Sequence, residues 1–119
     1  MNLRQNKYRN KEISIDGKIF QSKLEAKRYK QLALLEKAGE IKNLQMQVKF
    51  ELQEAFTKNK KHYRAITYTA DFMYFDNRSG QVIVEDTKGM KTDVFKIKQK
   101  LFEYKYPTLS LKIVTKEDI

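Results

Sequence analysis

The sequence has no cysteine and a single histidine, His62, among its 119 residues. The absence of cysteine excludes disulfides, cysteine-bound zinc and iron–sulfur clusters. One histidine leaves no partner for a histidine-based zinc site, and it has no surroundings that suggest a Ser-His-Asp triad. Any metal ion must therefore be bound by oxygen atoms.

Long apolar segments are also missing. The longest uninterrupted apolar runs, residues 32–35 and 72–75, are far too short to cross a bilayer, and the polar, basic N-terminus has no apolar stretch of signal length. We therefore expect a soluble cytoplasmic protein that makes no membrane contact.

Acidic residues are few relative to basic ones. The 25 Lys and Arg residues outnumber the 15 Asp and Glu residues, which gives a formal charge of +10 and favours polyanionic partners such as nucleic acid. Hydrophobic residues still make up 40% of the chain, enough for one compact core. We expect a single domain over residues 1–119, in which residues 1–19 form a basic N-terminal arm that can include a short hairpin.

Hydrophobic periodicity predicts an α/β protein with a mixed central sheet flanked by helices. Ser22 and Gly39 are suitable first and last signals for a helix, and Thr92 and Pro107 delimit a second one. The expected order is a helix at 22–38, strands at 44–53, 66–75 and 81–88, a helix from 92 to Pro107, and a strand at 109–113. Residues 57–64 are expected to form a basic loop.

Each helix is expected to bury one apolar stripe. For the first helix the expected stripe is Leu24, Leu32, Leu35 and Ala38. For the second it is Val94, Ile97, Leu101 and Phe102.

Two acids and a lysine stand out on the expected strands. Asp86 and Lys88 share one strand face, and Asp71 lies inside an otherwise apolar and aromatic segment. Either acid can form a structural ion pair with Lys88. Two carboxylates on neighbouring strands repel each other, however, and a divalent cation relieves that repulsion better than one lysine can.

Glu25 is the third candidate acid. Ser22 and Glu25 fit a capping box, which explains Glu25 by a purely local role. Glu25 also lies near the border of the expected helical stripe, from which its carboxylate can reach the sheet.

These residues together resemble the PD-(D/E)xK nuclease superfamily, and within it a group of small phage-encoded endonucleases and Holliday junction resolvase-like proteins. The resemblance covers residues 19–114 and rests on three segments: FQSKLEAKRY (20–29), YTADF (68–72) and VEDTKG (84–89). It implies a restriction-endonuclease-like core with the element order α-β-β-β-α-β. An alanine precedes Asp71 where the motif usually has proline.

The resemblance implies that Glu25, Asp71 and Asp86 bind Mg²⁺ or Mn²⁺, while Lys88 lies near the water that attacks the phosphate. Cleavage would then leave a 5′-phosphate and a 3′-hydroxyl. Glu85 competes for the role of the motif acid, but it lies three residues before Lys88 and points to the opposite face. Asp86 is the better assignment.

Candidate nucleic-acid contacts are more dispersed. Lys98 lies in the expected stripe of the second helix, where it either extends along the apolar surface to solvent or reaches a DNA phosphate. Further candidates are Gln45, Gln47, Lys58, Lys60, Lys61 and Arg64.

A short catalytic domain has little room for a base-reading module, which favours a structure-selective endonuclease acting on branched DNA or Holliday junctions in phage recombination or replication. Cutting two strands with one site per chain requires a homodimer. A phage-encoded chain would act in the cytoplasm of its host. The alternatives are a nicking or restriction-like endonuclease and a non-catalytic nucleic-acid-binding module.

Overall fold

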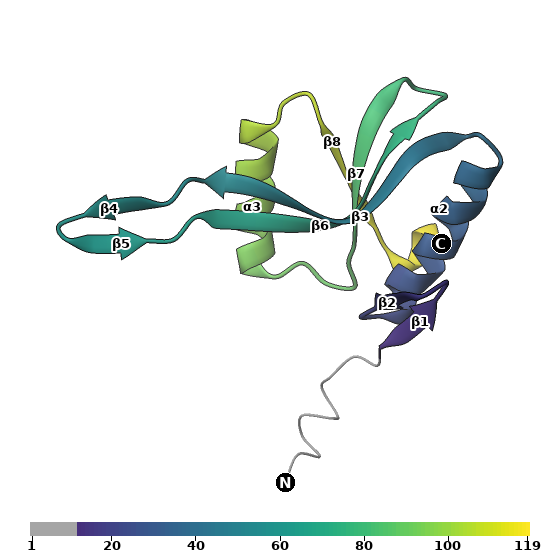
Figure 1. Ribbon diagram of the computed structural model, residues 1–119, viewed down its shortest axis with the longest axis horizontal. Helices are drawn as coiled ribbons and strands as arrows, with labels where there is room; N and C mark the ends of the chain where they lie inside the picture. Colours follow the sequence, from purple (N-terminus) through teal and green to yellow (C-terminus); the bar gives the residue numbers. More distant parts are fainter. Residues whose placement is uncertain (1–11) are drawn as a thin grey trace, which may run out of the picture.

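The computed structural model describes residues 12–119 (Figure 1). Most of the expected N-terminal arm, residues 1–11, lies outside the described residues. The helices are α2 (Lys23–Lys37) and α3 (Asp93–Lys105), followed by a short 3₁₀ turn, Lys116–Asp118. The strands are β1 (Ile13–Ile15), β2 (Lys18–Phe20), β3 (Ile41–Gln53), β4 (Phe56–Lys58), β5 (Lys61–Tyr63), β6 (Ile66–Asp76), β7 (Gln81–Thr87) and β8 (Ser110–Val114).

The central sheet has four strands in the order β3-β6-β7-β8. The first two pairings are antiparallel and the last, between β7 and β8, is parallel. Helix α3 makes the crossover that a parallel pair requires. The expected mixed sheet flanked by two helices is therefore confirmed, and β1 and β2 form the short hairpin expected within the N-terminal arm.

Both helices begin at the expected capping residues. The Ser22 hydroxyl accepts a hydrogen bond from the Glu25 amide, and the Thr92 hydroxyl accepts one from the Phe95 amide. Helix α2 ends before Gly39, which has a φ of +81°, a conformation that glycine adopts without steric cost. Within residues 12–119, no helix is long and apolar enough to cross a membrane.

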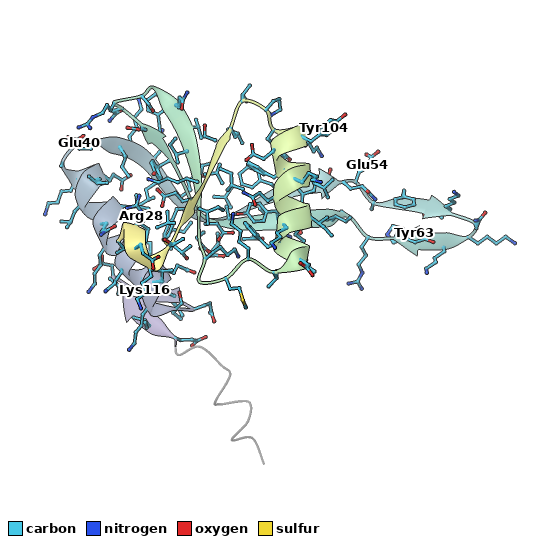
Figure 2. All side chains as sticks on the ribbon, turned by 180° about the vertical axis from the view of Figure 1, so that it is seen from behind. Arg28, Glu40, Glu54, Tyr63, Tyr104 and Lys116 are labelled. Atoms are coloured by element: carbon cyan, nitrogen blue, oxygen red, sulfur yellow. The ribbon has the colours of Figure 1, made fainter. Side chains whose placement is uncertain are left out.

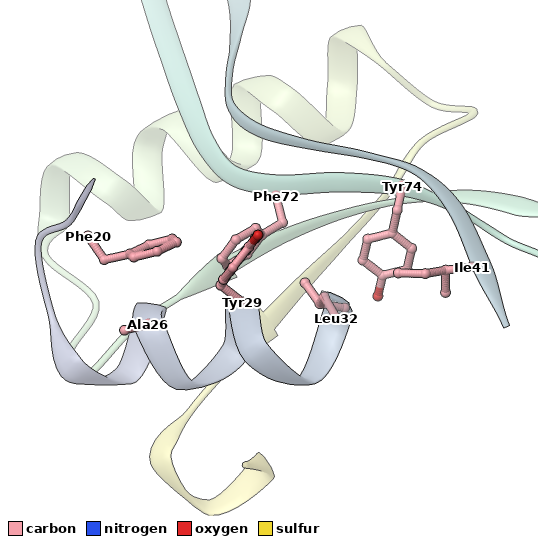
Figure 3. Packing of buried hydrophobic residues seen from close by; sticks show 7 residues of the cluster. All are labelled: Phe20, Ala26, Tyr29, Leu32, Ile41, Phe72 and Tyr74. Carbon is pink, nitrogen blue, oxygen red and sulfur yellow. The ribbon is translucent and has the colours of Figure 1, made fainter. Parts of the chain in front are cut away.

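The sheet is covered by two separate cores, one under each helix. The α2-side core consists of Phe20, Ala26, Tyr29, Leu32, Ile41, Phe72 and Tyr74 (Figure 3). The α3-side core consists of Phe50, Leu52, Tyr68, Ala70, Val84, Phe95 and Phe102.

Strands β3 and β6 change the face that they bury at one shared point. Ala70 belongs to the α3-side core and Phe72 to the α2-side core, although strand residues two apart normally share a face. The same change occurs in β3 between Met46 and Val48, which pair with Phe72 and Ala70. Gln47, between them, has a φ of +53° and allows the strand to turn over. The alternating apolar pattern of β3 thus serves two cores in succession.

One expectation about local structure was wrong, and the two expected helix stripes were right only in part, since Leu32 and Phe102 are buried as expected. Residues 57–64 do not form a loop, because β4 and β5 extend the chain into a hairpin. In α2 the buried face is Ala26, Tyr29 and Leu32, while Leu35 is exposed.

In α3 the buried residues are Phe95 and Phe102, whereas Val94 and Ile97 are more than 60% exposed. Large aromatic side chains bury more apolar area than valine or isoleucine, and they determine which face of the helix packs on the sheet.

Candidate active site

Asp71 and Asp86 lie where β6 and β7 separate. The pairing of these strands runs from Asp76 and Gln81 to Phe72 and Glu85, so Asp71 and Asp86 are the next residues on each strand. Beyond that point, Asp71 Oδ2 accepts hydrogen bonds from the Thr87 amide at 2.8 Å and the Thr87 hydroxyl at 2.7 Å. At the end of the β6–β7 ladder, the Thr87 amide thus donates to the Asp71 carboxylate instead of to a backbone carbonyl.

Asp86 is almost completely buried and is held on one oxygen. Its Oδ2 accepts a hydrogen bond from the Tyr68 hydroxyl at 2.6 Å and lies 3.4 Å from Lys88 Nζ. The lysine ammonium is 4.5 Å from the centroid of the Phe95 ring, so α3 contributes a wall to the site. The Lys88 amide donates to Val114, which fixes the end of β7 against β8.

Glu25 approaches from α2 and is also buried. Its backbone amide completes the Ser22 cap, while its carboxylate accepts a hydrogen bond from Gln47 Nε2 at 3.3 Å. The Ser22 hydroxyl thus caps the helix through the Glu25 amide, while the Glu25 carboxylate faces Gln47 and does not complete the expected capping box. Gln47 lies in β3 between the residues that pair with Ala70 and Phe72, beside Asp71.

The pKa values of Glu25 and Asp86 are both raised, in part by the nearby Asp71. Burial, followed by the negative charge of Asp71, raises the pKa of Glu25 to about 7. Burial and then Asp71 also raise the pKa of Asp86 to about 7, against the opposing effects of Tyr68 and Lys88. The pKa of Tyr68 rises because of its burial and its bond to Asp86, so the phenol remains a hydrogen-bond donor.

The donor set suits a hard divalent cation. Three carboxylates share one site with one lysine, and after burial the nearby Asp71 carboxylate is the next cause of the raised pKa values of Glu25 and Asp86. Among residues 12–119, no three acidic or histidine side chains have the spacing of a formed metal site. One oxygen of each acid accepts a hydrogen bond from Thr87, Tyr68 or Gln47, so an ion would have to bind the other oxygens or displace these contacts.

Glu85 lies on the other face of β7 and is not part of this site. It is fully buried and forms a two-pronged ion pair with Arg28 at 2.6 and 2.7 Å, and it also accepts a hydrogen bond from the Tyr74 hydroxyl. Arg28 is one helical turn after Glu25, so the pair also sets where Glu25 lies.

Sequence reasoning missed Tyr68, Thr87 and the Arg28–Glu85 pair. Thr87 could have been found from its place between Asp86 and Lys88, because a hydroxyl beside an acid at a strand end is a ready hydrogen-bond donor. Nothing local marks Tyr68 or Arg28, whose partners are 18 and 57 residues away in the chain.

The candidate DNA-contacting residues lie in three places. Gln47 is at the acids, as described. Lys98 is half-buried on α3, three residues after Phe95. Lys60, Lys61 and Arg64 are exposed on or beside the β4–β5 hairpin, which projects past α3 and away from α2 (Figure 1).

Fold and site together define a mixed α/β protein with an acidic cluster at the point where the pairing of strands β6 and β7 ends. The chain belongs to the DUF1064 family, described as "Protein of unknown function", whose model matches residues 5–118. Neither a curated protein nor a solved structure matches the chain.

Proposed function

We propose that this protein is a metal-dependent DNA endonuclease of the PD-(D/E)xK type. The observation that carries the proposal is the meeting of Glu25, Asp71 and Asp86, from three different elements, beside Lys88. A structural ion pair needs one acid for one lysine, and Lys88 pairs with Asp86, so that buried Glu25 and half-buried Asp71 have no counter-charge in that pair.

The residues have separate roles in this proposal. Glu25, Asp71 and Asp86 would hold Mg²⁺ or Mn²⁺, which supplies a more acidic bound water and offsets charge on the phosphate. Lys88 positions the attacking water or stabilises charge that develops at the phosphorus. Tyr68 orients Asp86, and Gln47 orients Glu25, each through a direct hydrogen bond.

DNA is the substrate that fits the charge of the chain. The net charge of +10 attracts the phosphate backbone, and Lys98 on α3 and the basic β4–β5 hairpin are candidate phosphate contacts. We propose selectivity for branched DNA, such as a Holliday junction, over a long sequence, because phosphate contacts of the kind that the basic hairpin can make position a protein on DNA without reading its sequence.

A homodimer completes the proposal. Each chain supplies one site, and α3 presents an apolar ridge in which Val94, Ile97 and Tyr104 are exposed and Leu101 is half-buried against the α3-side core. Their three-four-three spacing is the spacing by which two helices pair. Asp93 is at the first turn and Lys105 at the last, so an antiparallel pairing with a second copy brings opposite charges together.

The test is cleavage of linear, flapped and four-way DNA by the purified protein, with Mg²⁺, with Mn²⁺ and with a chelator. The proposal predicts metal-dependent cuts that leave a 5′-phosphate, with branched DNA preferred. DNA binding without cleavage under every metal condition would instead indicate a non-catalytic binding module, and cleavage of one strand of linear DNA would indicate a nicking enzyme.

A further inference from the structure

The β4–β5 hairpin, with Arg64 directly after it, contributes nothing to either core. All six of its strand residues are exposed, and even Tyr63, at the inner end of the hairpin, lies beyond α3 (Figure 2). An isolated two-stranded hairpin is only marginally stable in water. An element that buries so little of itself is more readily explained by a partner than by the stability of the fold.

The turn of this arm contains a residue that stability alone would not favour. Lys58 pairs with Lys61, which leaves Asn59 and Lys60 as a two-residue turn with φ of +53° and +63°. This left-handed turn strongly prefers glycine at its second position. Lysine in that place carries a backbone penalty and holds an ammonium group at the outermost point of the arm.

The two strands also place like charges opposite each other. Lys58 and Lys61 are direct cross-strand partners, and such pairs destabilise a sheet unless an anion lies between them. No acidic residue occurs between Glu54 and Asp71, whereas this stretch contains Lys58, Lys60, Lys61 and Arg64. The charge pattern is therefore complementary to a polyanion.

The aromatic residues indicate which kind of polyanion fits. Phe56 and Tyr63 stack on each other with centroids 4.7 Å apart and planes 10° apart, and Lys61 Nζ lies 5.1 Å from the Tyr63 centroid. Single-stranded nucleic acid is bound by aromatic faces that are free to stack on bases. Here the facing sides of the two rings are occupied by each other, and Lys61 covers part of Tyr63.

We propose that the β4–β5 arm enters a groove of duplex DNA, with its lysines on the phosphates that border the groove. The major groove, roughly 12 Å wide, admits a two-stranded ribbon of this kind. The inference rests on the proposed function only in taking DNA as the partner. It places the arm on a double-stranded part of the bound DNA.

The test is equilibrium binding to a fluorescein-labelled duplex of about 20 base pairs, two helical turns, in the presence of a chelator so that no cleavage occurs. Lys58→Gln/Lys61→Gln should lower affinity at least tenfold and reduce the slope of log affinity against log salt by about 1.8, or about 0.9 for each lost phosphate contact. The matched control is Lys27→Gln/Lys30→Gln, which removes the same charge from the exposed side of α2. It should change affinity less than threefold.

Lys60→Gly provides a second, independent readout. It should leave the melting temperature unchanged or raise it, because glycine suits the turn, while affinity for the duplex falls. Equal losses in the arm and control variants, unchanged binding by Lys60→Gly, or tighter binding of single-stranded DNA or duplex RNA would each overturn the inference. Because these measurements involve no cleavage, their outcome is independent of whether the protein proves to be a nuclease.

Discussion

Gln47 combines an unfavourable backbone conformation with a contact to a candidate metal ligand. A left-handed conformation costs a residue with a side chain about 1 kcal/mol or more, and strain of this kind collects at functional sites. In β3 the left-handed conformation of Gln47 has two consequences: it turns the strand over, and it directs the Gln47 amide towards Glu25.

Replacement of Gln47 by glycine separates the two effects. Gln47→Gly should keep or raise the melting temperature by relieving strain, and it should slow cleavage because Glu25 loses its hydrogen-bond donor. Asn43→Gly is the matched control, since Asn43 has a φ of +58° in the same strand but makes no contact with the acids. Slower cleavage in both variants would show that the backbone, and not the amide, matters.

The buried acids also make stability depend on pH. Glu25 and Asp86 have folded-state pKa values of about 7, above their ordinary values of 4.5 and 3.8, so the folded protein binds more protons than the unfolded chain. Free energy of unfolding must then fall as pH rises from about 4 to about 7, by roughly 1–3 kcal/mol in total. Urea melts in a chelator at pH 5 and pH 8 measure this difference.

Glu25→Gln is the informative comparison for this pH effect. It should reduce the difference between pH 5 and pH 8, because one of the two titrating groups has been removed. Stability that rises from pH 5 to pH 8 in the wild-type protein would contradict the placement of these acids in a shared buried site.

At the scale of elements, the Arg28–Glu85 pair ties α2 to β7. Removing one partner of a buried ion pair leaves an uncompensated charge and costs roughly 3–5 kcal/mol. Glu85→Gln should therefore lower the free energy of unfolding by about that amount. Glu85→Leu combined with Arg28→Met should recover much of the loss, because neither charge remains.

Cleavage by the double variant tests the positioning role of this pair. If the pair only stabilises the fold, the double variant should cut DNA at the wild-type rate. If the pair fixes the position of Glu25, as we expect, the double variant should be stable but slower.

The elements were largely predictable because their signals are local. Ser22, Gly39, Thr92 and Pro107 mark helix ends through their own backbone and side-chain chemistry, and strand alternation needs only neighbouring residues. The hairpin in residues 57–64 was missed because its turn is Asn-Lys rather than the usual Asn-Gly. The buried stripe of α3 was assigned correctly for Phe102 but not for Val94 and Ile97, because periodicity cannot tell which of two apolar faces packs on the sheet.

The candidate site was predictable only in part, because the local sequence marks the charged residues but not the residues that contact them. Asp71, Asp86 and Lys88 stand out because charged residues interrupt or end apolar strands. The residues that contact them, Tyr68 and Thr87, depend on where the pairing of β6 with β7 ends, which no local pattern in the sequence marks.

At the scale of the whole molecule, the dimer is the assembly that two-strand cutting requires. We expect sedimentation to show a dimer for the wild-type protein and a monomer for Ile97→Glu, which places a charge on the α3 ridge. Leu34→Glu is the control, since Leu34 is 68% exposed on α2 and Ile97 is 62% exposed. A stable monomer of the wild-type protein, both free and on DNA, would remove the model in which two sites cut two strands.

The most direct test of the catalytic assignment compares Asp86→Asn with Asp16→Asn, each of which exchanges one carboxylate for an amide. Asp16 is a suitable control because it lies in the β1–β2 turn with a φ of +53°, which asparagine tolerates well. Melting temperature with and without Mg²⁺ and cleavage of four-way DNA are measured on the same samples. Lys88→Ala is included because it should lose cleavage while still responding to Mg²⁺.

The account predicts that Mg²⁺ raises the melting temperature of the wild-type protein and of Asp16→Asn, and that both cleave DNA. Asp86→Asn should lose the Mg²⁺ response and cleavage but keep its DNA affinity, because affinity comes from the distributed basic surface. The contrary result is a wild-type protein with neither Mg²⁺ response nor cleavage, together with early melting of Asp86→Asn and Lys88→Ala. That result would make Asp86 and Lys88 a structural ion pair and contradict the nuclease assignment.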